Sequence, residues 1–305
     1  MNSGNLLSES LKAVNPEKSV MDSNWLDLNL LTEPSDTRAT FIHAKVTGLS
    51  RNDIDSEAVE RLGYSKDSVT DWISGRHPVP LPVLKDINGT AKRMGYLCLR
   101  ASKAKVKVPK LDSALAYFLG VIFGDGHIAY SKRKKGYLRF RVAIQKKRTK
   151  YSEFFLPPLI NAIFGITPRI YFTKRKSELI TILINSKIVS RFFTNLFHFS
   201  SGKKSDIVID FIKKLPQELQ LFFVAGLFDT DGGVSGSSFA FCNSSKKTAL
   251  FVRSFLSKIK IETKFYPQSK NEFKWYLVYV CGKHKNDFLQ KLPLKNGSKY
   301  ASGGI

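Results

Sequence analysis

The sequence predicts an α+β protein in which two similar halves follow an N-terminal all-α domain. Two observations support this prediction. A pattern of apolar helix, alternating strand and amphipathic helix occurs twice after residue 113, and the charge balance changes near residue 105. A repeated unit of this kind predicts two copies packed about a pseudo-twofold axis. We therefore divide the chain into an N-terminal domain (residues 1–105), a first half (106–215) and a second half (216–305).

Basic side chains are concentrated after the N-terminal domain. The 305 residues have a formal net charge of +24. Residues 1–100 contain 12 basic and 13 acidic side chains, whereas residues 101–305 contain 37 and 12, a net charge of +25. Such an excess favours a polyanionic partner, nucleic acid before an anionic membrane surface, although solubility alone would also explain excess lysine. The run from Lys103 to Lys110 is interpreted as a basic linker.

Three features argue against membrane, secreted and zinc-binding proteins. The longest apolar stretch, Ala114 to Gly124, has 11 residues and is too short to cross a bilayer. The N-terminus lacks the basic-then-apolar pattern of a signal peptide. Cys98, Cys242 and Cys281 show no CxxC spacing, which disfavours a disulfide scaffold or a structural zinc site. We expect a soluble intracellular protein, cytoplasmic or associated with the nucleoid.

A helix pair is predicted in the N-terminal domain. Glu57–Leu62 and Ser65–Ser74 have helical patterns separated by a turn at Gly63, and a third helix is expected from Pro82. The pattern resembles the helix-turn-helix of phage-repressor-type regulators, which would place the second helix in a major groove. A three-helix cap with Trp72 in its core explains the same pattern, and this domain has no net positive charge.

The two halves are expected to contain the same elements in the same order. Helices are predicted at Ala114–Asp125, Tyr151–Phe164, Leu219–Asp231 and Lys247–Lys258. Strands are predicted at Leu138–Gln145, Leu179–Ile184, Phe239–Asn243 and Trp275–Val280.

The repeat is clearest in two apolar helices that end in an aspartate. Each helix has small residues four positions apart, which share one helix face and let two backbones approach closely. These small residues are Gly120, Gly124, Gly226 and Thr230. If the two faces pair, Asp125 and Asp231 come together at the helix ends. Gly126 and Gly232 are then expected to end the helices in left-handed caps.

Asp125 and Asp231 are the candidate catalytic pair. Carboxylates at helix C-termini add to the negative end of the helix dipole, and a bound divalent cation would relieve this repulsion. Mg²⁺ prefers carboxylate oxygens together with substrate phosphate. Two carboxylates, Mg²⁺ and a phosphodiester are the components of metal-assisted in-line hydrolysis. One Asp-Gly turn after an apolar helix would favour a structural feature. Two copies in the same register favour a catalytic site.

Residues 118–126 and 224–232 resemble the signature motif of the LAGLIDADG homing endonucleases, in the single-chain form with two motifs. The resemblance covers about residues 110–305 and implies two αββαββα halves whose four-stranded sheets form a DNA-binding saddle. It implies site-specific cleavage of double-stranded DNA with Mg²⁺ as cofactor, and Asp125 and Asp231 as metal ligands. The sixth motif position, Phe123 and Asp229 here, is usually structural in this family.

The resemblance also implies supporting catalytic residues. A polar residue near the end of the second strand of each half matches Gln145 and Asn243. A lysine late in each half matches Lys204, or its neighbour Lys203, and Lys299. Phosphate contact or plain surface exposure explains these lysines equally well.

The strand Leu138–Gln145 is the candidate DNA-reading strand. Its alternation places apolar residues on one face and Arg139, Arg141 and Gln145 on the other. Arg and Gln pair with guanine and adenine in the major groove, although an ordinary solvated strand has the same pattern. The matching second-half strand offers only Asn243 beside two phenylalanines, so we expect the first half to contribute more to base recognition. Phosphate contacts are expected from Lys132, Arg133, Lys134, Lys174, Arg175 and Lys176.

We therefore predict a monomeric, Mg²⁺-dependent endonuclease of the LAGLIDADG type with a double-stranded DNA target and no membrane partner. Intron RNA is a further candidate partner. The alternative on the same fold is an RNA maturase or a DNA-binding regulator that does not cleave. The N-terminal domain is expected to add DNA contacts but no chemistry, so that a chain starting near Lys105 would still cleave.

Overall fold

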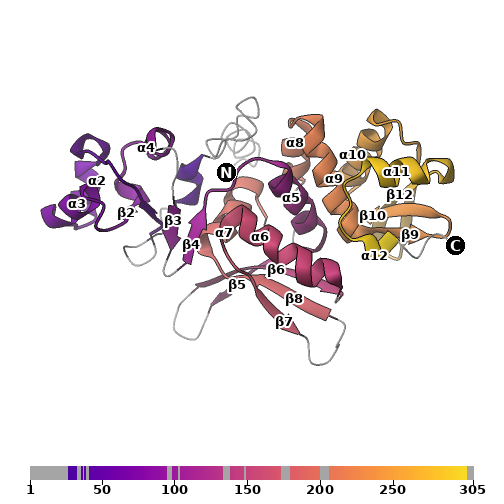
Figure 1. The fold of residues 1–305 in the computed structure, drawn as a ribbon, viewed down its shortest axis with the longest axis horizontal. Coiled ribbons are helices and arrows are strands. Elements are labelled where there is room, and N and C mark those ends of the chain that lie inside the picture. Colours follow the sequence, from indigo (N-terminus) through magenta and orange to yellow (C-terminus); the bar gives the residue numbers. More distant parts are fainter. Residues whose placement is uncertain are drawn as a thin grey trace.

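Three four-stranded antiparallel sheets follow one another along the chain, one in the N-terminal region and one in each half (Figure 1). The computed structural model describes residues 27–32, 36, 38, 41–94, 98–101, 104–132, 138–147, 149–172, 179–199 and 206–300. Within these ranges no helix has the length and apolar character needed to cross a membrane. The mixed α+β class and the two sheets of the halves agree with the fold that the sequence predicts.

The N-terminal region contains a sheet, so the expectation of an all-α domain is wrong. Its strands are β1 (His43–Lys45), β2 (Val79–Pro80), β3 (Cys98–Ala101) and β4 (Ala104–Lys107), in the order β2-β1-β3-β4. The run that we interpreted as a linker includes β4. Lys and Val alternate there, with Val106 buried between two exposed lysines, and this period of two is typical of a half-buried strand.

The predicted helix pair of the N-terminal region is present. It consists of α2 (Ser56–Arg61) and α3 (Lys66–Ile73), joined by a turn in which Gly63 adopts a φ of +67°. Trp72 is buried in the core of this region. The third helix, α4 (Ile87–Met94), begins later than predicted because Leu81–Val83 form a 3-10 turn and Leu84 forms a β-bridge with Ile54. A DNA-reading role for α3 stays a prediction.

The first half contains the two predicted helices and the two predicted strands, together with two further strands. Its sheet has the order β5-β6-β8-β7, formed by β5 (Gly126–Lys132), β6 (Leu138–Lys147), β7 (Arg169–Phe172) and β8 (Leu179–Ile184). Its helices are α5 (Ser113–Asp125), α6 (Leu156–Phe164), α7 (Lys187–Arg191) and α8 (Ile207–Lys213). A helical turn at Tyr151–Phe155 precedes α6, and another at Phe192–Leu196 continues α7.

The second half repeats this architecture. Its sheet has the order β11-β12-β10-β9, formed by β9 (Gly232–Ser235), β10 (Ser238–Asn243), β11 (Thr263–Lys270) and β12 (Phe273–Val280). Its helices are α9 (Gln217–Asp231), α10 (Lys246–Lys258), α11 (Lys285–Lys291) and α12 (Gly297–Tyr300).

The two phenylalanines of β10 face the core, which corrects the expectation that they flank a DNA-reading residue. Phe239 and Phe241 are fully buried, on the side where α10 packs against β10. Because side chains alternate between faces along a strand, Ala240 and Cys242 lie on the opposite, outer face of the sheet.

Helices α5 and α9 pack directly against each other between the two halves, through the small-residue faces that the sequence predicts (Figure 1). A Cβ atom on Gly120 would overlap the carbonyl oxygen of Phe223, and one on Gly124 would overlap the Thr230 side chain. Gly226 approaches the α5 backbone in the same way, since its Cβ would lie 3.2 Å from the Gly120 Cα. The close contact of the two backbones therefore requires glycine at these positions.

Neither Gly126 nor Gly232 forms the left-handed cap that we expected. Their φ angles are −69° and −89°, in the extended region, and the chain passes straight from each helix into β5 or β9. Glycine is required there for a different reason. A Cβ on Gly126 would lie 2.7 Å from the Cα of Ile122, and one on Gly232 would lie 2.6 Å from the Phe228 ring.

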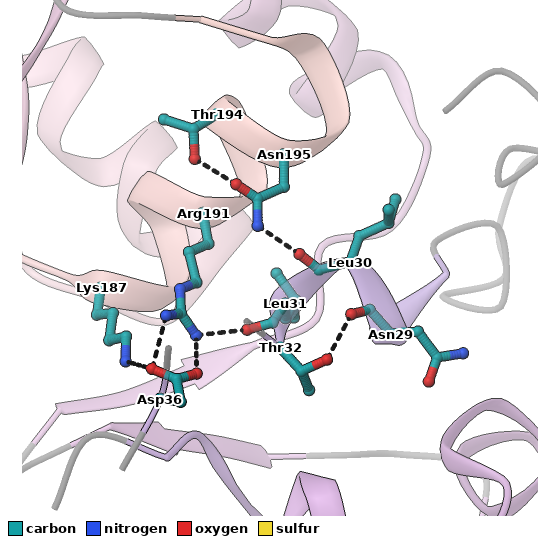
Figure 2. A network of polar contacts seen from close by, with 9 residues as sticks. All are labelled: Asn29, Leu30, Leu31, Thr32, Asp36, Lys187, Arg191, Thr194 and Asn195. Atoms are coloured by element: carbon teal, nitrogen blue, oxygen red, sulfur yellow. Dashed lines mark hydrogen bonds and ion pairs between the residues drawn. The ribbon is translucent and has the colours of Figure 1, made fainter. Parts of the chain in front are cut away.

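A buried ion-pair network connects the N-terminal segment to the first half (Figure 2). The Asp36 carboxylate accepts hydrogen bonds from the two terminal nitrogens of Arg191 at 2.6 and 2.7 Å and pairs with Lys187 at 2.5 Å. Arg191 also donates to the Leu31 carbonyl at 2.8 Å, and Asn195 of the following helical turn donates to a neighbouring carbonyl at 2.7 Å. We call Asp36, Lys187 and Arg191 the Asp36 network.

Apolar packing reinforces this connection. Leu28 and Leu31 from the N-terminal segment and Val106 from β4 belong to the same buried cluster as Phe164 and Phe192 of the first half. The change in net charge near residue 105 therefore does not mark a boundary between two separate hydrophobic cores.

Candidate active site

Asp125 and Asp231 lie at the adjoining C-terminal ends of α5 and α9. Each follows directly on a residue of the helix contact, Gly124 or Thr230. Both aspartates are half-buried, and each immediately precedes the first strand of a sheet. The structure thus places the two aspartates that the spacing singled out at adjoining helix ends, where the helix pair meets the two sheets.

Asn243 at the end of β10 contacts Asp231. Its side-chain nitrogen donates to Asp231 Oδ2 at 2.9 Å, and its side-chain oxygen accepts from the Ser245 backbone N–H at 2.9 Å. Because a backbone N–H can only donate, the amide oxygen must face Ser245 and the amide nitrogen must face the carboxylate. Asn243 therefore holds the Asp231 carboxylate in a defined orientation.

Lys299 caps the end of α9. Its ammonium group donates to the Thr230 carbonyl at 2.6 Å and to the Phe228 carbonyl at 3.3 Å. A cation at a helix C-terminus offsets the negative end of the helix dipole. The structure therefore places Lys299 beside Asp231, in contact with the helix backbone, and its role in activating water stays a prediction.

Asp229 forms a buried network that the sequence did not reveal. Its carboxylate accepts from the Tyr117 hydroxyl of α5 at 2.5 Å and from the Lys295 backbone N–H at 2.7 Å. The Tyr151 hydroxyl lies 2.9 Å from that of Tyr117. Burial raises the pKa of Asp229, and the hydrogen bonds from Tyr117 and Lys295 offset part of this rise. The only signal for Tyr117 in the sequence is a hydroxyl within an otherwise apolar helix.

The candidate DNA-reading strand of the first half, β6, is described by its backbone register. In β6, Gln145 pairs with Thr181 of β8, and Arg141 pairs with Ala129 of β5. The side chains of Lys132, Arg139, Arg141 and Gln145 lie outside the described part of the structure. Arg133, Lys134, Lys174, Arg175, Lys176, Lys203 and Lys204 lie outside the described residues altogether. The DNA-binding and catalytic roles of all these residues stay predictions.

The donor groups at the helix ends fit a hard divalent cation. In the described ranges, no three or more His, Cys, Asp and Glu side chains gather into a protein-only metal cluster. Mg²⁺, however, is usually bound through one or two carboxylates together with water and substrate phosphates. Asp125 and Asp231 supply those two carboxylates.

The second half matches a known family. Residues 218–293, from α9 to α11, match the LAGLIDADG-like domain. The uncharacterized protein MJ0398 of Methanocaldococcus jannaschii is 24% identical over 176 residues, which are 57% of this chain. The match spans only 59% of the length of that relative.

Several solved structures are similar to this chain at low identity. The homing endonuclease I-DmoI, in complex with DNA and Ca, is 18% identical with a TM-score of 0.49, over 63% of this chain and 98% of I-DmoI. The homing endonuclease I-WcaI, bound to its DNA recognition sequence, is 17% identical with a TM-score of 0.40, over 62% of this chain and 84% of I-WcaI. WhiA from Thermatoga maritima is 14% identical with a TM-score of 0.38, over 63% of this chain and 61% of WhiA.

Proposed function

We propose that this chain is an endonuclease of the LAGLIDADG type that cleaves double-stranded DNA at a specific site with Mg²⁺. The observation that supports the proposal most strongly is the meeting of two aspartate-terminated helices, each of which leads into the first strand of a four-stranded sheet. The family match of residues 218–293 and the net charge of +25 after residue 100 support it as well.

In this proposal Asp125 and Asp231 would hold the divalent cation. When bound, a divalent cation supplies positive charge that polarises the scissile phosphodiester and lowers the pKa of a water molecule. Asn243 orients the Asp231 carboxylate through its amide nitrogen. Lys299 fixes the last turn of α9, from which Asp231 projects, by binding its carbonyl oxygens.

The remaining roles follow the expectations from the sequence. Gln145 occupies in the first half the place that Asn243 has in the second, and Lys204 or Lys203 acts on water or phosphate. Bases are read by Arg139, Arg141 and Gln145, and phosphates are bound by Lys132, Arg133, Lys134, Lys174, Arg175 and Lys176. The protein acts as a monomer, and the N-terminal region adds DNA contacts.

The proposal is tested with a plasmid library that carries a randomised insert. The full chain is incubated with the library in Mg²⁺ or in EDTA, and the cut ends and the bound fraction are sequenced. Wild type and the control Glu218→Gln, at an exposed position in the first turn of α9, are expected to cut one class of sequence in Mg²⁺ only. Asp125→Asn and Asp231→Asn are expected to bind that class without cutting it.

Two outcomes would contradict the proposal. Cutting by Asp125→Asn or Asp231→Asn at the wild-type rate would remove the assigned site. Wild-type protein that binds one class of sequence and cuts none of it would favour the non-cleaving DNA-binding regulator.

A further inference from the structure

A groove lies between α8 and α10, on the helix-covered side of the second-half sheet. The two helices begin beside each other, since the Ser245 hydroxyl donates to Asp206 at 2.7 Å and Lys247 pairs with Asp210 at 2.5 Å. Side chains of α8, α9 and α10 line the groove, which has a volume of about 840 Å³. Because α10 also packs against β10, β11 and β12, the groove and the outer face of this sheet lie on opposite sides of the sheet.

The floor of the groove is apolar. It is formed by Leu250, Phe251 and Phe255 of α10. The two phenylalanines are four positions apart on one helix face and are buried, whereas Leu250 beside them is 40% exposed. Covering Leu250 with a second apolar surface would remove it from water and stabilise a complex.

The rim of the groove is basic. Lys213 of α8 and Lys246 and Lys258 of α10 line the groove and are exposed. Among the described residues, no carboxylate forms an ion pair with these three lysines. Asp206 also lines the groove, but its carboxylate already accepts a hydrogen bond from a serine hydroxyl. The charge of the groove is therefore complementary to an acidic ligand.

The floor and the size of the groove suit a protein helix better than a nucleic acid. Unpaired bases bind by stacking on open aromatic rings, but Phe251 and Phe255 are only 4% and 1% exposed. A duplex presents mainly phosphates and polar base edges, which would leave Leu250 uncovered. An α-helix is about 10 Å across and rises about 1.5 Å per residue, so about two turns of helix have the volume of the groove.

We propose that the groove between α8 and α10 binds an acidic amphipathic helix of a partner protein. Apolar side chains three and four positions apart on that helix cover Leu250 and the phenylalanine floor, and its carboxylates pair with Lys213, Lys246 and Lys258. This inference goes beyond the proposed nuclease function, because it gives the second half a protein partner. The partner and the DNA occupy opposite sides of the sheet, so both can be bound at the same time.

Fluorescence anisotropy of the full chain with a labelled peptide tests the proposal. The probe is a helical peptide of about 18 residues, with leucines at i, i+3, i+4 and i+7 and with glutamate and alanine elsewhere. A second peptide has the same composition, with its leucines spread around the helix. Wild type is expected to bind the amphipathic probe about ten-fold more tightly than the second peptide. Lys213→Glu and Leu250→Gln are each expected to weaken binding of the amphipathic probe by about ten-fold.

The chain offers a matched control for each variant. Lys214→Glu makes the same change in charge at the neighbouring exposed position, which does not line the groove. Leu289→Gln removes a leucine of the same exposure, 40%, from α11. Both controls are expected to bind the amphipathic probe nearly as tightly as wild type. Binding of oligo(U) and of a blunt DNA duplex is measured with the same variants and is expected to be unchanged by Lys213→Glu and Leu250→Gln.

Three results would overturn the proposal. Equal binding of the two peptides by wild type would show that charge alone attracts them. Wild-type affinity for the amphipathic probe in Lys213→Glu and Leu250→Gln proteins, folded as judged by circular dichroism, would exclude the groove as the binding site. Nucleic-acid binding that weakens as much as peptide binding in these variants would make the groove a nucleic-acid site. Cleavage is measured separately with Asp125→Asn, so failure of the proposed function and failure of this inference are distinguishable.

Discussion

Asp36 accepts two hydrogen bonds from the guanidinium group of Arg191, a residue 155 positions later in the chain (Figure 2). The two side chains are only 5% and 2% exposed, so neither charge is solvated by bulk water. A bidentate pair between arginine and a carboxylate is among the strongest side-chain interactions in proteins. The N-terminal segment is therefore an integral part of the first half.

Removing the Asp36 charge is expected to destabilise the protein. Asp36→Asn leaves the buried Arg191 without its anionic partner and should lower the free energy of unfolding by about 3–5 kcal/mol. The double variant Asp36→Leu with Arg191→Met should lose less, because it removes the Asp36 and Arg191 charges together and leaves only the Lys187 charge, whose side chain is 14% exposed. Denaturant unfolding of the wild type, the single variants Asp36→Leu and Arg191→Met and the double variant measures the difference as a double-mutant cycle. Glu262→Gln, in an exposed ion pair, is the control and should change little.

The contribution of Asp36 is expected to depend on pH. Burial alone would raise the pKa of Asp36, but the hydrogen bonds from Arg191 and Lys187 outweigh this effect and lower it. A group whose pKa is lowered by folding stabilises the protein above its unfolded pKa and loses that contribution as the pH falls through the folded pKa. The stability difference between wild type and Asp36→Asn should thus be constant at neutral pH and shrink below about pH 4. Urea unfolding over a pH series measures it, and a constant difference down to about pH 2 would contradict the assignment.

A chain that starts near Lys105 is now expected to fold poorly. Such a truncation removes Asp36, and it removes β3, the pairing partner of β4. It also removes Leu28 and Leu31 from the shared core. This expectation replaces the one made from the sequence, and thermal unfolding followed by circular dichroism tests it. A truncated chain with the melting temperature of the full chain would show that the two regions are independent.

The contact between α5 and α9 is expected to leave no room for even one methyl group on its glycines. Gly120→Ala and Gly226→Ala should each destabilise the protein by about 1–3 kcal/mol through overpacking, although alanine favours the helical state by about 1 kcal/mol. Gly297→Ala is the matched control, since a Cβ there meets no atom within 4 Å. The three variants are compared by denaturant unfolding. Equal stability of all three would disprove the close packing of the helices.

Asn243 is expected to matter for cleavage more than for folding. Asn243→Ala removes the hydrogen bond that orients Asp231 and should slow cleavage by about 10–100-fold, the usual effect of losing a side chain that orients a metal ligand. The exposed neighbour Ser244→Ala is the control. Single-turnover cleavage measures the rate, and unfolding measures stability. Unchanged cleavage by a folded Asn243→Ala protein would show that Asn243 has no role in the active site.

The local features of the halves were predictable from the sequence alone. Helices α5 and α9 are recognisable from their apolar composition, and their pairing from the four-residue spacing of Gly120 and Gly124. Asp125 and Asp231 follow from that spacing, because neighbours three and four positions apart share one helix face whatever the rest of the chain does. The position of Asn243 at the end of β10 was predictable as well, from the resemblance to a known family.

Contacts between distant parts of the chain were decided only by the tertiary structure. The alternating lysines and valines of β4 are compatible with either a linker or a strand. Only the pairing of β3 with β4 shows that they form a strand. The sequence suggested a catalytic role for Lys299. Its hydrogen bonds to the α9 carbonyl oxygens, however, depend on where α12 packs. The partner of Asp36 lies 155 residues away. Such long-range contacts depend on how whole elements pack to bury their apolar faces. The residue pattern within a single element does not show which distant element it will pack against.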